Sequence, residues 1–223
     1  MTEELIKAEF HCHTVYSPDS LTRITKLIRH ARNLGLDKLA ITDHSTIAGA
    51  QEAFALAPDL IVPGVETRSA QGEVLGYFVT ENIPKRLTAL ETVKRMKDQG
   101  AVICLPHPFD YPRSNWDPRV LEEILPYLDG IEVFNARSRD QKTNLKALEF
   151  ARKHGLLELA GSDAHTLMEL GKAHMTLPDF SNAEELKVAL KTANRSCHPS
   201  SPAAHIFSRL AKISKDLSPK PDV

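Results

Sequence analysis

The sequence predicts an α/β fold in which short buried strands alternate with amphipathic helices around a parallel β/α barrel. Two observations support this prediction. Short apolar runs alternate about seven times with stretches in which apolar residues recur at helical spacing. Polar side chains follow the ends of most of the apolar runs, as they do where active sites form on such sheets. Regular strand–helix alternation is typical of parallel sheets with right-handed crossovers.

Four strands and three helices are expected in the first part of the chain. Leu21, Leu27 and Leu34 belong to a series of apolar residues at helical spacing, and similar series occur further along. Gly35 directly follows the first series and Gly100 lies four residues after the third, and glycine often caps the end of a helix. The expected strands cover residues 6–10, 39–41, 60–62 and 74–79, and the expected helices cover 21–34, 46–56 and 87–96.

Three strands and three helices are expected in the second part. Pro126 must end or kink the first of these helices, and Gly155 stops the second. No element is expected after Ala193. The tail from Ser196 contains four prolines, and we expect it to lie over the surface and to fray after about Lys215. The strands cover 101–105, 130–134 and 156–160, and the helices cover 121–128, 145–151 and 183–193.

The composition is that of one globular domain. A chain of 223 residues suits a single domain over 1–223, with the barrel at about 5–195 and the tail at about 196–223. A net charge of -1 predicts no global attraction to nucleic acid or to a membrane surface. No apolar run reaches the roughly 20 residues of a membrane span, and the N-terminus does not resemble a signal peptide. Together with three widely spaced cysteines, these features predict a cytoplasmic protein, with the oligomeric state left open.

Seven histidine and carboxylate residues lie at or just after the ends of expected strands. Because the carboxyl ends of parallel strands meet on one face of a barrel, we expect these side chains to share one site. Imidazole and carboxylate groups are the ligands that Zn²⁺, Mn²⁺ and Fe²⁺ take in proteins. The sequence therefore predicts a metal centre with several ions. The seven residues are His11, His13, His44, Glu66, His107, Asp163 and His165.

Two of the motifs have the spacing of neighbours on one face of a strand. His11 and His13 are two residues apart, so both imidazoles can bind one ion. Asp163 and His165 repeat that spacing, and we expect the same geometry there. Asp43 directly precedes His44 and could orient it, since a ligating histidine usually donates its second N–H to such a group.

The motifs HxHT, TDH, GVE, HP and GSDAH occur in this order between about Ala8 and Leu177. In this order and context, the series resembles the polymerase and histidinol phosphatase (PHP) family of metal-dependent phosphoesterases. The resemblance implies a distorted, TIM-like barrel of seven strands that holds up to three metal ions. The family includes histidinol phosphatases, nucleotide phosphatases and the nuclease-like domains of some bacterial DNA polymerases.

The resemblance also implies how the ligands are shared among the ions. Asp19 joins the set by this resemblance, although it could instead cap the helix that begins near Leu21. Glu73 stands where many relatives have a histidine, and a carboxylate can still bind Mn²⁺ or Fe²⁺. If Glu73 is not a ligand, Glu132 or Asn135 is the alternative. The first ion would take His11, His13, Glu66 and Asp163, the second Glu66, His107 and Glu73, and the third Asp19, His44 and His165.

The predicted function is hydrolysis of a small phosphomonoester, such as a nucleotide, sugar or amino-alcohol phosphate. Two or three divalent ions (Mn, Zn or Fe) would activate the attacking water and neutralise charge on the phosphoryl oxygens. Arg68 and Arg137 are the preferred phosphate-binding residues, because the guanidinium group matches phosphate geometry. Arg113, Arg139 and Lys172 are further candidates for this role, and His174 is a candidate proton donor.

Three alternatives remain open at this point. A single-strand nuclease would require basic and aromatic side chains leading from the site, and an aromatic content of 6% gives little support. Nucleic acid is therefore a possible but not a favoured substrate. A non-catalytic metal-binding module would be expected to lack ligands that this chain has. A metal-dependent hydrolase of C–N bonds commonly has a carboxylated lysine at a strand end, and no lysine lies there.

The remaining histidines and the single tryptophan are interpreted as structural. Trp116 either covers the mouth of the site or packs a loop. Four histidines, on helices or in the tail, are expected at the surface: His30, His154, His198 and His205.

Overall fold

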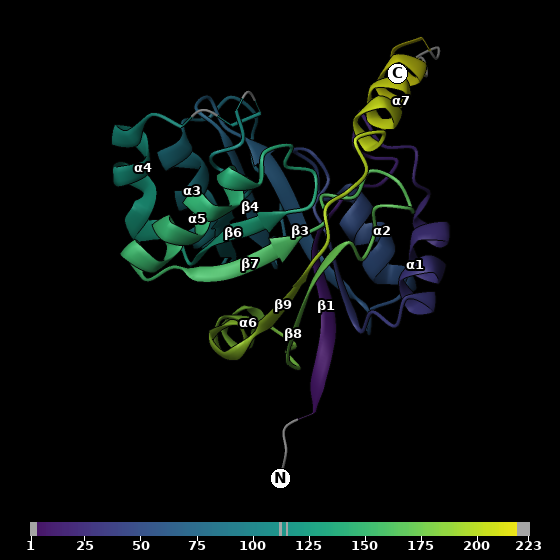
Figure 1. Ribbon diagram of the computed structural model, residues 1–223, viewed down its shortest axis with the longest axis horizontal. Helices are drawn as coiled ribbons and strands as arrows, with labels where there is room; N and C mark the ends of the chain where they lie inside the picture. Colours follow the sequence, from purple (N-terminus) through teal and green to yellow (C-terminus); the bar gives the residue numbers. More distant parts are fainter. Residues whose placement is uncertain (1–3, 112, 115, 218–223) are drawn as a thin grey trace.

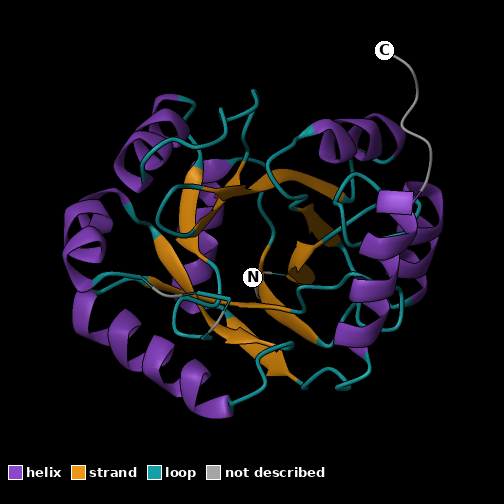
Figure 2. Cartoon of the chain, turned by 90° about the horizontal axis from the view of Figure 1, so that it is seen from above, coloured by secondary structure: helices purple, strands orange, loops and turns teal. Residues whose placement is uncertain are grey.

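The computed structural model describes residues 4–111, 113–114 and 116–217. Nine strands form one sheet, in the order β7-β6-β5-β4-β3-β2-β1-β8-β9, and the sheet curls into a nearly closed barrel with helices around the outside (Figure 2). The strands are β1 (Leu5–Cys12), β2 (Lys38–Ile41), β3 (Ile61–Arg68), β4 (Glu73–Tyr77), β5 (Val102–Leu105), β6 (Gly130–Asn135), β7 (Leu157–Gly161), β8 (Ala173–Pro178) and β9 (Asn194–Cys197).

The helices lie mainly between successive strands, as the alternation of the sequence predicts. The kink expected at Pro126 is confirmed, because α4 ends at Ile124 and continues as a single 3₁₀ turn. The helices are α1 (Ile24–Asn33), α2 (Ala48–Leu56), α3 (Ala89–Asp98), α4 (Pro118–Ile124), α5 (Gln141–His154), α6 (Ala183–Ala189) and α7 (Ala204–Leu217), and the 3₁₀ turns are η1 (Leu125–Tyr127) and η2 (Leu190–Thr192).

The α/β barrel is confirmed, but the count of seven strands is wrong. Strands β8 and β9, at the edge beside β1, were not predicted. Burial alternates along β8, with every second side chain only partly covered, so it contains no continuous apolar run. The sequence of β9 is Asn-Arg-Ser-Cys, a polar edge strand without a hydrophobic signal. Both strands are stabilised by pairing with neighbouring strands and not by a local apolar sequence.

The sheet is also not parallel throughout. Strands β1, β2 and β3 are parallel to one another, as are β5, β6 and β7, but β4 is antiparallel to both of its neighbours. A tight turn joins β3 to β4, closed by hydrogen bonds between Ser69 and Gly72. Such a turn is too short for a crossover helix, so the next strand must reverse. As a result, the first residue of β4, Glu73, pairs with Arg68 at the end of β3 and reaches the same rim.

An apolar core fills the barrel beneath this rim. The ring of Phe10 lies 5.6 Å from that of Tyr77 and 6.1 Å from that of Phe180 (centroid distances), and all three are buried. The Tyr77 hydroxyl donates to the Phe10 carbonyl oxygen at 3.0 Å. Strand β8 and helix α6 lie at the end of the barrel opposite α7 (Figure 1). Because Phe10 directly precedes His11, this core fixes the position of the strand end that carries His11.

The end of the chain differs from the expectation of a surface tail without regular elements. Residues 204–217 form helix α7, which projects from the barrel at the rim end (Figure 1). The predicted fraying after Lys215 falls largely on residues 218–223, outside the described residues. Within the part of the chain that the structure describes, no helix is both long and apolar enough to cross a membrane.

Candidate metal centre

The seven predicted rim residues do converge on one site. A cavity of about 1280 Å³ opens at the rim, and its lining includes Glu66, His107, Asp163 and other predicted ligands. His11 and His13 lie beneath it and are fully buried. Asp19 and Glu73, which the family resemblance added, also line the cavity. The structure therefore brings together all nine side chains that the sequence predicts as ligands.

The first group of ligand atoms lies deepest. Asp163 Oδ1 is 3.7 Å from His11 Nε2 and 3.3 Å from His13 Nε2. The Glu66 carboxylate is next to both imidazoles, with Oε1 3.6 Å from His11 Nε2 and Oε2 3.5 Å from His13 Nε2. The atoms of His11, His13 and Asp163 are close enough to bind one ion, and the Glu66 carboxylate, which the resemblance adds to this set, lies beside them.

A second group shares Glu66. His107 Nε2 lies 3.1 Å from Glu66 Oε1 and 3.9 Å from Glu73 Oε2. Burial and the charge of Glu66 raise the pKa of Glu73, although His107 partly opposes the shift. Two carboxylates facing each other in this way favour a cation between them. Glu66 lies between the two groups, where it could bridge two ions.

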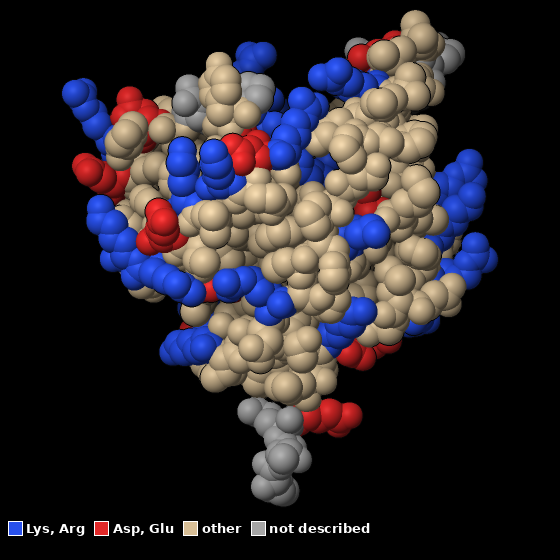
Figure 3. Space-filling view, in the orientation of Figure 1, with Lys and Arg blue, Asp and Glu red and all other residues tan. Residues whose placement is uncertain are grey.

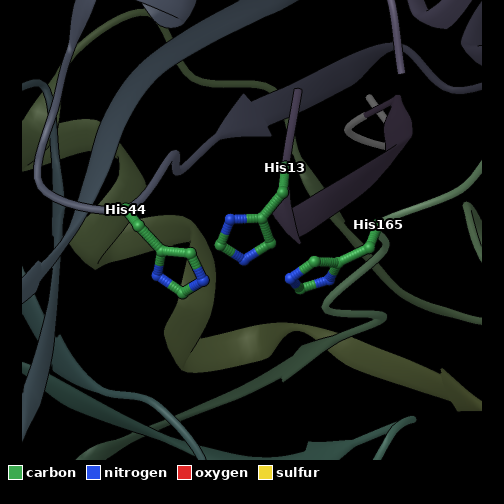
Figure 4. Close-up of side chains that lie close together, drawn as sticks. All are labelled: His13, His44 and His165. Atoms are coloured by element: carbon green, nitrogen blue, oxygen red, sulfur yellow. The ribbon is translucent and has the colours of Figure 1, made fainter. Parts of the chain in front are cut away.

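The third group consists of His13, His44 and His165, whose rings face one another (Figure 4). Asp19 completes it, with Oδ2 3.6 Å from His44 Nε2 and 3.2 Å from His165 Nε2. The alternative role of Asp19 as a helix cap is wrong, because α1 begins at Ile24 with Arg23 in the cap position and without a side-chain cap.

The donor atoms fit divalent cations. His11 Nε2, His13 Nε2, Asp19 Oδ1 and Glu66 Oε2 are buried without a hydrogen-bond partner among the described residues. An unpartnered buried polar atom costs about 1–3 kcal/mol, and four such atoms aimed at one region require compensation. Imidazole nitrogens and carboxylate oxygens at these separations are suited to Zn²⁺, Mn²⁺ or Fe²⁺.

In both His11 and His13, the ring nitrogen Nδ1 contacts a hydrogen-bond acceptor. His11 Nδ1 lies 3.0 Å from Glu132 Oε1, and His13 Nδ1 lies 3.0 Å from Ser17 Oγ. Ser17 in turn donates to Asp43 Oδ1 at 2.6 Å. With Nδ1 donating, Nε2 is the nitrogen of each ring that is left to bind a metal ion once it carries no proton.

Asp43 and Glu132 therefore act differently from their predicted roles. Asp43 does not orient His44, because its oxygens accept from Thr14 and Ser17, and His44 Nδ1 lies instead 2.9 Å from Glu66 Oε2. Glu132 orients His11 instead of serving as the alternative ligand, since its Oε2 accepts from the His107 backbone N–H and from Asn135 Nδ2.

The rim backbone is strained at three positions. Ser45, His107 and Asp163 have φ angles of 54°, 28° and 53°, a region that residues other than glycine rarely adopt. Asp163 and His165 follow the end of β7 at Gly161, as expected, but the strand-like geometry expected for the pair does not hold, because Asp163 has a positive φ. Ala164 instead pairs with Cys12 across the barrel seam, and this contact sets the two ligands beside β1.

Charges in the metal-free site are strongly coupled. Burial lowers the pKa of His11, but Asp163, Glu132 and Glu66 more than offset this, so its pKa lies well above the usual value. The pKa of His44 is raised in the same way by Glu66 and Asp19. Burial and the nearby His165 and His44 depress the pKa of His13. The site therefore holds protons on some of the imidazoles that an ion would displace.

Two arginines are bound into the site. Arg113 Nη1 donates to Asp163 Oδ2 at 2.5 Å, and its Nε and Nη2 both donate to Asp110 Oδ2. Arg137 is buried, contacts His165 Nδ1, and has Nε 3.4 Å from Glu169 Oε1. Its guanidinium is thus already occupied, which weakens the prediction that it binds phosphate.

The other residues predicted to bind phosphate or donate a proton differ in whether they line the cavity. Arg68 lines the cavity with an exposed side chain, and Arg139 also lines it. His174 lies on β8 with Nδ1 3.2 Å from the Gly171 carbonyl oxygen, and neither it nor Lys172 lines the cavity. Trp116 is buried in the core against Gly72, so it packs a loop.

Several residues of the site were not predicted. Ser17 has no motif of its own, and Glu132 was considered only as a ligand. His205, interpreted as a surface histidine, lines the cavity and its Nε2 lies 3.1 Å from the Arg137 carbonyl oxygen. Only the helical spacing of the last segment could have indicated that His205 belongs to a helix beside the rim.

Comparisons with known proteins agree with this geometry. A family model described as "PHP domain" matches residues 9–131, and one described as "PHP-associated" matches residues 141–194. An uncharacterized protein of Methanocaldococcus jannaschii is 36% identical over 179 residues, covering 78% of this chain and 72% of its own. A "probable phosphatase" of Caldicellulosiruptor saccharolyticus is 21% identical over 204 residues, covering 77% of this chain and 85% of its own.

A similar fold occurs in a solved structure of a two-domain protein from Bacteroides vulgatus, described as containing a predicted PHP-like metal-dependent phosphoesterase. The TM-score is 0.74 at 20% identity, and the match covers 88% of this chain and 66% of that one. At this identity the likeness concerns the fold alone.

Proposed function

This chain belongs to the PHP family and is a metal-dependent phosphoesterase, and on that premise we propose that it hydrolyses a small phosphomonoester. One observation carries the proposal. Three adjacent groups of ligand atoms lie at a single open cavity, and the first group shares Glu66 with the second and His13 with the third. We propose that the nine ligands are those predicted from the sequence, with two or three ions of Mn, Zn or Fe.

Divalent ions bound there would supply an activated water at neutral pH and would neutralise charge on the phosphoryl oxygens. The protein contributes the orientation of the ligands. Glu132 and the pair Ser17–Asp43 fix the rings of His11 and His13. Each ring then needs no rearrangement when an ion binds, and such preorganisation is worth about 10–100-fold in metal affinity.

One arginine is available to bind the phosphate. Arg113 is not, because its guanidinium already donates to Asp163, Asp110 and Asn135. Arg68 has an exposed side chain at the cavity that makes no hydrogen bond or ion pair within the described part of the chain, although its charge acts on the nearby Glu73. We assign Arg68 to hold the phosphate from the solvent side, and Arg113 to hold the Asp163 carboxylate in place.

The test is phosphate release from a panel of nucleotide, sugar and amino-alcohol phosphates by the Mn²⁺-reconstituted protein. The wild type should release phosphate from at least one class, and Asp163→Ala should release none. Asp98→Ala removes an exposed carboxylate on α3 and serves as the matched control, with activity like that of the wild type. If wild type and Asp163→Ala are equally inactive while both preparations contain metal, the proposal is wrong.

A single-strand nuclease is the second candidate, because one observation favours it. The cavity rim carries several lysine and arginine side chains, including Lys85, Arg86 and Arg139. Basic rims of this kind can follow a nucleic-acid backbone. Only two tyrosines accompany them, Tyr16 and Tyr111, and single-strand binding usually relies on aromatic stacking. Single-stranded oligonucleotides therefore belong in the same panel as the alternative substrates.

A further inference from the structure

Helix α7 lies outside both segments that match the family models, yet it forms one wall of the cavity. Those segments end at residue 194, and α7 begins at Ala204. Five of its residues line the cavity, at spacings of three, one, three and three, so they share one helical face. They are His205, Ser208, Arg209, Lys212 and Lys215.

Polar contacts attach α7 at both ends. Near its start, Arg137 Nη2 donates to Ser208 Oγ at 2.7 Å. Near its end, Lys215 Nζ donates to the carbonyl oxygens of Val15 and Ser17, each at 2.5 Å. These two contacts join the helix to the loop after β6 and to the loop that carries Asp19.

The orientation of α7 is the reverse of what core packing would produce. A surface helix normally buries its apolar face, but Ile206, Leu210 and Ile213 are 60%, 55% and 54% exposed. The side chains that α7 does bury are small ones, Ala204, Ser208 and Ala211. The face that lines the cavity is basic, and Figure 3 shows Lys and Arg side chains beside α7. Burial of apolar surface therefore does not explain why this face meets the cavity.

Arg209 and Lys212 lie between the two attachment points. Both line the cavity, and neither side chain has a hydrogen bond or an ion pair with any residue in the ranges that the structure describes. Arg113, in contrast, is paired with Asp163 and Asp110, and Arg137 with Glu169. Cations left unpaired beside a cavity favour an anionic ligand there.

We propose that Arg209 and Lys212 bind a second phosphate of the substrate, away from the phosphoryl group that is hydrolysed. The inference rests on the proposed phosphoesterase function and narrows its substrate class to small molecules with two phosphate groups. A cavity of about 1280 Å³ has room for such a molecule between the ligand groups and α7. The helix is then a specificity element added beyond the family-matched segments.

The test compares fructose 1,6-bisphosphate with fructose 6-phosphate as probes for the Mn²⁺-loaded protein. In the double variant Arg209→Gln/Lys212→Gln, the ratio of kcat/KM for the bisphosphate to that for the monophosphate should fall about tenfold or more, since charged hydrogen bonds are lost. Lys26→Gln/Arg29→Gln removes the same two charges from exposed positions on α1, which does not line the cavity, and should leave the ratio unchanged.

Binding of the two probes to the Ca²⁺-loaded protein, measured by isothermal titration, gives the same comparison without turnover. If no probe or panel substrate is hydrolysed, the proposed function fails, and the titration alone decides the role of α7. An unchanged ratio of affinities in a double variant with wild-type melting temperature would overturn the inference. So would a selective loss of single-stranded oligonucleotide binding with bisphosphate binding intact, which would assign the basic face to nucleic acid.

Discussion

At the scale of single residues, the site depends on which nitrogen of each histidine carries a proton. His11 and His13 both direct Nε2 into the site because Glu132 and Ser17 hold Nδ1. Glu132 accepts three hydrogen bonds while only 2% exposed, so donors on three different segments hold its carboxylate in one position. This carboxylate is therefore as important for the geometry of the first ligand group as the ligands themselves.

Removing the charge of Glu132 tests this role. Glu132→Gln keeps the shape of the side chain but weakens the acceptor for His11, so affinity for Mn²⁺ should fall about 10–100-fold. Titration of the metal-free protein measures the effect. Glu123→Gln, an exposed change on α4, is the control and should bind Mn²⁺ like the wild type. Equal affinity of the two variants would mean that the orientation of His11 does not depend on Glu132.

The raised pKa values of two histidines in the site lead us to expect that metal binding releases protons. The folded-state pKa values of His11 and His44 are raised, so the metal-free protein holds these protons more tightly than a free imidazole would and must lose them to bind an ion. Metal affinity should therefore increase as the pH rises through these pKa values. Calorimetric titration with Mn²⁺ in two buffers of different ionisation enthalpy measures the release directly. Heats that do not depend on the buffer would show that no proton is displaced.

The raised pKa values of His11 and His44 also determine whether the stability of the folded protein rises or falls with pH. A raised histidine pKa stabilises the folded, metal-free protein below about pH 6.5, the unfolded value, and this contribution is lost as the pH rises through the folded value. Metal replaces the protons at higher pH. The difference in melting temperature between loaded and metal-free protein should therefore grow from pH 6 to pH 8, as measured by scanning calorimetry at both pH values.

At the scale of secondary-structure elements, close packing of strands brings the ligands together. Gly161, at the end of β7, lies where any side chain would collide with β1 and β6. A Cβ there would be 2.3 Å from Glu132 Oε1 and 2.5 Å from the His11 Cβ. The position needs glycine because two neighbouring strands with functional side chains approach it so closely.

Gly161→Ala should therefore damage both folding and metal binding. The collision should cost about 1–3 kcal/mol of unfolding free energy and should shift His11 away from Glu132, which weakens Mn²⁺ binding. Denaturant unfolding and metal titration measure the two effects. Gly100→Ala is the comparison, because no atom lies within 4 Å and only its positive φ causes strain. It should lose stability but keep its metal affinity, and equal metal affinity in both variants would contradict the packing argument.

The sequence predicts an element only when local features of that element, and not distant contacts, stabilise it. Strands such as β5 and β7 are short, apolar and followed by polar residues, so both the strand and the ligand after it could be located. The antiparallel direction of β4 could not be predicted from its own sequence, because strand direction depends on the turn at Ser69–Gly72 and not on the composition of the strand. For the same reason Glu73 was placed at the site by family resemblance and not by geometry.

Contacts between distant segments set the remaining limit on prediction. The pairing of Asp43 with Ser17 and of Glu132 with His11 joins residues that are 26 and 121 positions apart. Helix α7 did leave a signal, since Ile206, Leu210, Ile213 and Leu217 recur at helical spacing, but the prolines before it suggested an irregular tail. Even with the helix predicted, its apolar stripe would have been assigned to the core, whereas the structure exposes it.

At the scale of the whole molecule, a net charge of -1 conceals a separation of charges. Carboxylates and imidazoles are concentrated at the floor of the cavity, while lysines and arginines surround its mouth. This arrangement attracts anionic substrates at the mouth and cations at the floor. The chain thus needs no overall positive charge to bind a phosphate ester.

Occupation of the floor by metal should stabilise the whole fold. A ligand that binds only the folded state adds about 2.7 kcal/mol at a concentration 100 times its Kd. Mn²⁺ should therefore raise the melting temperature, and a chelator should reverse the increase. Asp163→Ala, which lacks one of the deepest ligands, should show a much smaller increase. If the melting temperatures of wild type and Asp163→Ala respond equally to Mn²⁺, the stabilising ions are bound elsewhere.

The central claim is that several ions bind at the three ligand groups. The most direct measurement is anomalous X-ray diffraction at the manganese edge from crystals of the Mn²⁺-reconstituted protein. We expect two or three separate peaks, with one among His11, His13 and Asp163, one between Glu66 and His107, and the third beside His44 and His165. A single peak, or peaks away from these side chains, would contradict the claim.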